Sequence, residues 1–205
     1  MKYKWLNNKK NKELIVFFNG WGVDEGVVSN LYPRNFDVLM FYDYNNLETD
    51  FDFSVFGQYS KKYLIAWSMG VMIATLFNVE YDYKVAINGT LKPIDNEYGI
   101  PVRIYDLTLK NYNPKGAQKF LKSMFNKNYK LPEINRDFEN QKSELAALKE
   151  YKSNLNFKYD KILISDDDKI IPSKNQSNFW GIKPNLRSGH SPFNIYHTWS
   201  EILYG

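Results

Sequence analysis

Three residues that lie far apart in the sequence have the types needed to turn a serine hydroxyl into a nucleophile. The first is Ser68, in the pentad Ala66–Gly70. A serine with small residues two positions away on each side, between an apolar strand and an apolar helix, is typical of a sharp turn that exposes its hydroxyl. The usual pattern has glycine where this chain has Ala66, and alanine is small enough for the turn. The pentad alone is weak evidence, because a buried turn serine gives the same pattern.

A nucleophilic serine needs a base, and the chain has only two histidines. His190 lies in Ser188-Gly189-His190-Ser191-Pro192, which predicts a loop, where functional side chains concentrate. His197 lies in a segment predicted to be the C-terminal helix, where a histidine more often has a surface or packing role. We therefore expect His190 to be the base.

A carboxylate is expected to orient that histidine, and three consecutive aspartates at 166–168 follow the apolar run Ile162–Ile164. Many hydrolases carry this acid four residues before a proline, and Asp168 stands in that register before Pro172. Asp167 is the alternative. A solvated loop or a helix N-cap would also account for such a cluster.

The loop Asn19-Gly20-Trp21-Gly22 follows the first strongly apolar strand. In hydrolases with a serine on a sharp turn, this loop supplies one backbone N–H to the developing oxyanion, and the residue after the serine supplies another. We therefore expect the oxyanion hole to consist of the amides of Trp21 and Met69. The flanking glycines let the loop bend over the serine. A plain turn with a packed tryptophan is the alternative.

The elements that must position these residues alternate between strand and helix. We predict strands at 14–19, 37–42, 62–67, 84–89 and 161–166, with a weaker one near 101–106. We predict helices at 24–31, 69–79, 173–180 and 193–203. Continuous apolar runs in the strands fit a sheet that is buried on both faces. The predicted fold class is α/β, an α/β-hydrolase fold with a mostly parallel central sheet flanked by helices.

The stretch 108–156 has few strand signals, much lysine and asparagine, and two helix-like pieces at 116–125 and 138–151. In this fold, an insertion at that place forms a cap over the active site. We therefore expect a single domain over 1–205 with a small helical cap insertion at about 108–156. Some apolar residues of the first piece could line an acyl channel: Phe120, Leu121, Met124 and Phe125.

Four stretches of the chain resemble the BioG type of pimeloyl-acyl-carrier-protein methyl ester esterase, a small branch of the α/β-hydrolases. They are Phe17–Gly22, Ala66–Val71, a run from Ala86 to Pro101, and Gly189–Phe193. The specific parts are Asn-Gly-Trp-Gly and the series Ile-Asn-Gly-Thr, Pro-Ile-Asp and Gly-Ile-Pro, which generic hydrolases lack. The resemblance implies hydrolysis of the methyl ester of pimeloyl carrier protein in biotin synthesis, with release of methanol.

Three other functions remain open at this point. They are a type II acyl-carrier-protein thioesterase, a broad-specificity carboxylesterase, and a non-catalytic binding protein of the hydrolase fold. The presence of Ser68, Asp168 and His190 together argues against the last of these. Within the family-specific run, Asn88 and Asp95 could support the site or only form turns at strand ends.

Composition narrows the class of protein further. The chain has no cysteine, which excludes disulfides and thiolate metal sites, and its two histidines do not form a pair. We expect no metal and no other cofactor. The N-terminal residues lack the apolar core of a signal peptide, and no apolar run approaches the ~20 residues needed to span a bilayer. These features predict a cytoplasmic protein without a membrane partner.

Positive charge is concentrated in the predicted cap. Six lysines and no acidic residue lie between Thr108 and Lys130, whereas the whole chain carries a net charge of +4. This pattern favours a docking surface for an acidic acyl carrier protein, with Lys115, Lys119 and Lys122 as substrate-binding residues. A solvated helix face is the alternative. Nucleic acid is not an expected partner, since the chain has no binding motif for it.

Overall fold

The computed structural model describes residues 1–125 and 131–205, and a six-stranded sheet forms its centre. The strands are β1 (Lys2–Asn7), β2 (Glu13–Phe18), β3 (Phe36–Tyr42), β4 (Lys61–Trp67), β5 (Tyr83–Ile87) and β6 (Lys161–Leu163). Their order is β1-β3-β2-β4-β5-β6, with β1 antiparallel to β3 and all other pairs parallel. The predicted mostly parallel sheet is therefore confirmed.

Both faces of this sheet are buried, as the continuous apolar runs predicted. In β2, Val16 and Phe18 belong to one hydrophobic cluster, whereas Ile15 and Phe17 belong to a second cluster on the other face. All four side chains are completely buried. Alternate residues of a strand point to opposite faces, so a strand covered on both sides needs apolar residues throughout.

The helices are α1 (Gly70–Ile73), α2 (Val102–Asn111), α3 (Pro114–Met124), α4 (Phe138–Leu148), α5 (Ser173–Trp180) and α6 (Trp199–Tyr204). Short 3₁₀ turns cover Glu25–Val28, Phe53–Gln58, Ala74–Leu76 and Phe193–Ile195. Within the part of the chain that the structure describes, none of the helices combines the length and apolar character required to span a bilayer.

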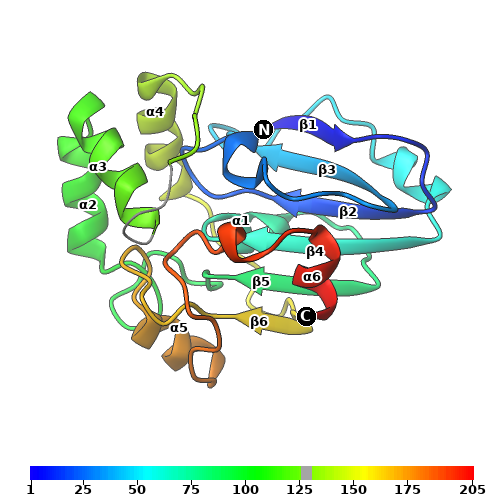
Figure 1. Cartoon of the computed structure of the whole chain (residues 1–205). Helices are drawn as coiled ribbons and strands as arrows, with labels where there is room; N and C mark the ends of the chain where they lie inside the picture. The colour runs from blue at the N-terminus through cyan, green and yellow to red at the C-terminus, as the bar shows by residue number, and fades with distance from the viewer. Residues whose placement is uncertain (126–130) are drawn as a thin grey trace.

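The segment between β5 and β6 holds α2, α3 and α4, which lie together beyond the carboxyl ends of the parallel strands (Figure 1). The side chain of Asn113 caps α3 by accepting a hydrogen bond from the Gly116 amide at 2.9 Å. Asp137 caps α4 in the same way, at 3.0 Å from the Asn140 amide. Both helices lie where the sequence predicted helical pieces, and α2 was not expected.

The weak strand predicted near 101–106 is wrong, since α2 occupies this segment. Its first turn forms because the amides of Ile104 and Tyr105 both donate to the Pro101 carbonyl. Tyr105 is the one buried residue of this helix, so only one face of α2 is packed against the rest of the protein. The alternating polar and apolar residues that resemble a strand are largely exposed here.

Two predicted helices are broken, because tertiary and side-chain hydrogen bonds compete with helix formation. The helix predicted at 69–79 contains only α1 and a 3₁₀ turn, in which the Thr75 hydroxyl bonds back to the Met72 carbonyl at 2.7 Å. The C-terminal helix starts only at Trp199, since the His197 carbonyl accepts a hydrogen bond from Tyr32. His197 therefore lies before α6 and not within it.

Two other elements are shorter than the sequence predicted, and one strand was not predicted. The segment 24–31 forms only a 3₁₀ turn at Glu25–Val28, and β6 ends at Leu163. The edge strand β1, in which lysines alternate with Tyr3 and Trp5, was not predicted. These two aromatic side chains pack against Phe51, at 5.0 and 6.3 Å between ring centroids. Edge strands of this kind carry a weaker apolar signal than central ones.

Candidate active site

Ser68 lies on a strained turn between β4 and α1. Its φ angle is +57°, in the left-handed region, and its amide donates to the Ile87 carbonyl at 2.9 Å. A Cβ added at Gly70 would lie 2.3 Å from the Phe18 carbonyl oxygen. Glycine is therefore required at position 70, because the end of β2 closely approaches the start of α1 there.

The structure brings Ser68, His190 and Asp168 together in one chain of hydrogen bonds. His190 Nε2 lies 2.8 Å from Ser68 Oγ, and His190 Nδ1 lies 2.8 Å from Asp168 Oδ2. All three residues are buried. An ionised carboxylate can only accept hydrogen bonds, so Nδ1 carries the proton beside it. Nε2 is then free to accept the proton of the serine hydroxyl.

The loop after β6 selects Asp168 among the three aspartates. Its Oδ1 accepts hydrogen bonds from the amides of Ile170 and Ile171, at 2.8 and 3.0 Å. Its Oδ2 accepts from Gln176 Nε2 of α5 at 2.8 Å, next to the bond with His190. Asp167 instead points outward, with its side chain 58% exposed and 3.2 Å from Lys169. The four-residue spacing between Asp168 and Pro172 thus corresponds to a turn whose backbone amides donate to the Asp168 carboxylate.

Asn88, directly after β5, ties together the loops that carry the acid and the histidine. Its Nδ2 donates to Ser165 Oγ and to the His190 carbonyl, both at 2.8 Å, and its Oδ1 accepts from the Ser165 amide at 2.7 Å. Trp67 Nε1 donates to the same His190 carbonyl at 2.8 Å. Of the two residues left open by the sequence, Asn88 supports the site, whereas Asp95 accepts hydrogen bonds within its own turn.

Trp67 and Gln176 are supporting residues that were not predicted from the sequence. Trp67 is the variable residue of the pentad, and its type alone gave no sign of a contact with the histidine loop. Gln176 lies eight residues after Asp168 on α5, where a glutamine would ordinarily face solvent. The Asn-Gly pair at 88–89 belongs to the family-specific motif Ile-Asn-Gly-Thr. The structure explains the glycine, because a Cβ at Gly89 would lie 2.5 Å from the Ser68 carbonyl oxygen.

The loop Asn19–Gly22 lies against the serine turn. A Cβ added at Gly20 would lie 3.3 Å from Ser68 Cβ and 2.9 Å from a ring carbon of Trp67. Gly22 adopts a φ of +75°, which favours glycine. Within the described residues, the amides of Trp21 and Met69 donate to no other group of the protein. They are the two amides expected to bind an oxyanion.

An apolar pocket opens over Ser68, with about 580 Å³ of empty space that includes its open mouth. The three helices beyond the sheet form much of its wall, through Ile104 and Tyr105 of α2, Phe120 and Met124 of α3, and Leu145 of α4. Leu121 and Phe125 pack against the hydrophobic core instead. Burial raises the pKa of Tyr105, whose hydroxyl donates to the Leu145 carbonyl at 2.6 Å.

The lysines proposed for docking lie on α3, away from the hydrogen-bonded chain. Lys115, Lys119 and Lys122 are exposed. Lys127 and Lys130, which contribute to the same charge cluster, lie outside the described residues. Among the residues that the structure describes, no group of three or more histidine or carboxylate side chains is arranged to hold a metal ion.

The sequence model of the pimeloyl-ACP methyl esterase BioG matches residues 1–202. The chain belongs to the BioG family. The crystal structure of BioG from Haemophilus influenzae is similar throughout, with a TM-score of 0.88 and 31% identity over 98% of this chain and 99% of that one. The predicted family is confirmed.

A second similarity concerns part of a larger protein. A malonyl-[acyl-carrier protein] O-methyltransferase of Bacteroides fragilis (strain 638R) is 37% identical to this BioG-family chain over 181 residues. The match covers 82% of this chain and 36% of that protein, so the chain spans about a third of the length of this relative.

The wider structural similarity confirms the α/β-hydrolase fold. An esterase from Thermogutta terrifontis has a TM-score of 0.63 and 12% identity, over 93% of this chain and 86% of that one. These neighbours show the fold, and membership in the BioG family supports a hydrolase.

Proposed function

We propose that the chain hydrolyses the methyl ester of a pimeloyl acyl carrier protein, as a serine hydrolase in biotin synthesis. Ser68 is the nucleophile, His190 the base, and Asp168 the acid that orients it. One observation carries the proposal, namely the two 2.8 Å contacts that join these three side chains beneath an apolar pocket. Membership in the BioG family supports the ester as the bond that is cleaved.

In the first half of the reaction, Ser68 Oγ attacks the ester carbonyl carbon while His190 Nε2 takes the hydroxyl proton. The carbonyl oxygen becomes an oxyanion, which the amides of Trp21 and Met69 bind. Each such donor is worth about 3 kcal/mol in comparable acyl-transfer sites. His190 then returns the proton to the methoxy oxygen, the C–O bond breaks, and methanol leaves.

In the second half, a water molecule attacks the acyl-serine and gives its proton to His190. The second tetrahedral intermediate collapses, which frees the ω-carboxylate and restores the Ser68 hydroxyl. Asp168 keeps the imidazole in one tautomer and stabilises its protonated form in both halves. These residues supply a nucleophile, a base and an oxyanion site for both steps.

The shape and lining of the pocket support an acyl substrate. Its wall is mainly apolar, which suits the methylene chain of a dicarboxylic acid half-ester. The similarity to part of a malonyl-[acyl-carrier protein] O-methyltransferase supports a substrate that carries both a methyl ester and a carrier protein. We also propose that residues 1–205 form one hydrolase domain, in which the helices between β5 and β6 act as the cap.

Methanol release distinguishes this function from its alternatives. The purified chain should convert the methyl ester of pimeloyl carrier protein into the free acid, with one methanol per product and little cleavage of unmodified acyl thioesters. A preference for thioesters would indicate a type II thioesterase. Equal turnover of p-nitrophenyl esters of several lengths, without a preference for the carrier protein, would indicate a broad carboxylesterase. Failure of a serine-reactive phosphonate to label the native protein would indicate a binding protein.

The exposed lysines of α3 are proposed to dock the acidic carrier protein. Reversing their charge in a Lys115→Glu, Lys119→Glu, Lys122→Glu variant should lower kcat/KM for the carrier-protein ester at least about tenfold, through slower encounter. The same variant should hydrolyse a small free ester within about twofold of the wild-type rate, because none of the three lysines lines the pocket.

A matched control places the same charge change at the opposite end of the sheet. Lys12 and Lys61 adjoin the amino ends of β2 and β4, and Lys9 is exposed nearby. Reversing these three lysines should leave both substrates unaffected at moderate ionic strength. If the α3 variant loses activity equally on both substrates, or the control variant loses as much, the docking surface is refuted.

A further inference from the structure

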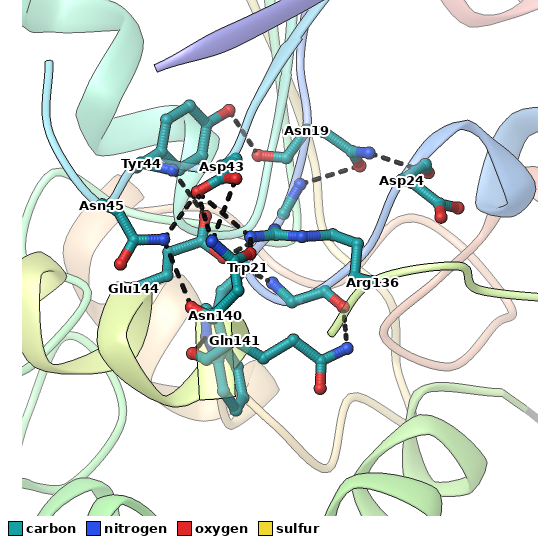
Figure 2. A network of polar contacts seen from close by, with 12 residues as sticks. Asn19, Trp21, Asp24, Asp43, Tyr44, Asn45, Arg136, Asn140, Gln141 and Glu144 are labelled. Carbon is teal, nitrogen blue, oxygen red and sulfur yellow. Dashed lines mark hydrogen bonds and ion pairs between the residues drawn. The ribbon is translucent and has the colours of Figure 1, made fainter. Parts of the chain in front are cut away.

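A buried cluster of charged side chains joins α4 to the loop beside Ser68 (Figure 2). Glu144 of α4 is completely buried, and its Oε2 accepts hydrogen bonds from the Gly22 amide at 3.1 Å and from Arg136 Nη1 at 2.7 Å. Its Oε1 accepts from the Tyr44 amide at 2.8 Å. One carboxylate of the proposed cap thus holds two backbone amides of the hydrolase core.

Gln141, nearly one turn earlier on α4, holds the same loop from its other side. Its Nε2 donates to the Gly22 carbonyl at 2.8 Å, and its backbone carbonyl accepts from Trp21 Nε1 at 2.7 Å. The Tyr112 hydroxyl fixes the amide by donating to Gln141 Oε1 at 2.8 Å. Both backbone polar groups of Gly22, and the indole of Trp21, therefore depend on α4.

A second path runs from Glu144 through Tyr44 to the start of the loop. The Tyr44 hydroxyl donates to the Asn19 carbonyl at 2.8 Å, and its amide is the one held by Glu144. The side-chain oxygen of the same residue, Asn19 Oδ1, accepts a hydrogen bond from the Gly20 amide at 2.9 Å. Residues on both sides of the Trp21 amide are therefore fixed by contacts that lead to Glu144.

Burying the charged carboxylate of Glu144 costs free energy, because the charge loses its contact with water. Burial raises the pKa of Glu144, while the Arg136 charge and the two backbone donors act against that effect. Well-packed apolar residues often stabilise a core as well as a buried ion pair does. The Glu144 carboxylate does, however, give the Gly22 and Tyr44 amides an acceptor that fixes their direction. This buried carboxylate therefore fits a role in orienting the backbone better than one in stabilising the fold.

We propose that Glu144 and Gln141 are positioning residues that fix the Trp21 amide where the oxyanion forms, an inference that rests on the proposed function of Ser68. The carboxylate holds Gly22 N–H, the glutamine amide holds Gly22 C=O, and the peptide between Gly20 and Trp21 is thereby aimed at the serine. A displacement of 1 Å in such a group can lower a rate about a hundredfold.

Glu144→Gln tests this role. A glutamine has one carbonyl oxygen, so whichever way its amide is turned, an NH₂ group faces either the Gly22 or the Tyr44 amide. We expect kcat for p-nitrophenyl butyrate to fall about 10- to 100-fold while KM stays within about threefold. Phenylboronic acid forms a tetrahedral adduct with a nucleophilic serine, and its Ki should rise by the same factor as kcat falls.

Asp43→Asn is the matched control within the same cluster. Asp43 contacts Arg136 at 3.2 Å, and its other partners are Lys2, Asn45 and Asn140. Among the described residues, no amide of the loop donates to it. The substitution removes one buried charge, as Glu144→Gln does, and asparagine tolerates the φ of +59° at this position. We expect kcat, KM and Ki within about threefold of wild type.

A second variant keeps the test decisive if Glu144→Gln does not fold. Gln141→Met removes the bond to the Gly22 carbonyl but retains the backbone acceptor of the Trp21 indole, and kcat should fall about tenfold with a parallel rise in Ki. Normal kcat in folded Gln141→Met, or equal losses in Glu144→Gln and Asp43→Asn, would overturn the positioning role. A wild-type protein that neither turns over the ester nor binds the boronate would instead overturn the proposed function.

Discussion

Replacing Ser68 with alanine should lower kcat for the methyl ester at least about a thousandfold, because the members of such a hydrogen-bonded chain act as a unit. The substitution removes the only atom that can form the acyl-enzyme, while the pocket and both proposed oxyanion donors remain. Steady-state methanol release measures the loss. Among the described residues, the Ser68 hydroxyl makes one hydrogen bond, to His190 Nε2, so thermal unfolding should occur near the wild-type temperature.

Ser29→Ala provides the control for this experiment. Ser29 is exposed and does not line the pocket, and within the described part of the chain its hydroxyl donates to the Gly26 carbonyl alone, at 2.9 Å. This variant should keep full activity and should still react with a serine-directed phosphonate, whereas Ser68→Ala should not react. If Ser68→Ala retained turnover, Ser68 would be removed from the mechanism.

Asp168→Asn should lower kcat about 10³- to 10⁴-fold, by changing the tautomer of His190. The amides of Ile170 and Ile171 hold the carbonyl oxygen of the new side chain where Oδ1 now lies. Its NH₂ group then occupies the place of Oδ2 and donates to His190 Nδ1, so the imidazole proton moves to Nε2. A protonated Nε2 cannot accept the Ser68 proton. Kinetics on a small ester measure the effect without any contribution from carrier-protein docking.

Asp167→Asn is the isosteric control one residue away. The Asp167 side chain is largely exposed and pairs with Lys169, so its neutralisation should change kcat by less than about threefold. The opposite pattern, with activity lost in Asp167→Asn and kept in Asp168→Asn, would show that the neighbouring carboxylate is the acid. Crystal structures of both variants would show whether the Ile170 and Ile171 amides retain their acceptor.

Features that depend on local sterics could be predicted from the sequence. The turn at Ser68 requires small neighbours whatever the rest of the chain does, and the close approaches at Gly70 and Gly20 are consistent with this. Buried parallel strands require apolar residues on both faces, so β2, β3, β4 and β5 fell close to their predicted places. The loop position of His190 could be read from its glycine and proline neighbours.

Features that depend on distant partners could not be predicted. The break before α6 comes from hydrogen bonds between the Tyr32 backbone and the backbone on either side of Thr198. Glu144 and Gly22 are separated by 122 residues, and a glutamate on a helix predicts a solvated face in the absence of other information. Asn88 was ambiguous for the same reason, since its partners lie on two later loops.

The dependence of Gly22 on α4 restricts how this protein can be redesigned. Caps of hydrolases are attractive places to change specificity, because their helices line the substrate pocket while the sheet stays the same. In this chain, a graft that replaces α4 also deletes the acceptor for a core amide and the donor for its carbonyl. A chimaera must therefore transplant an equivalent carboxylate and amide along with the new pocket wall.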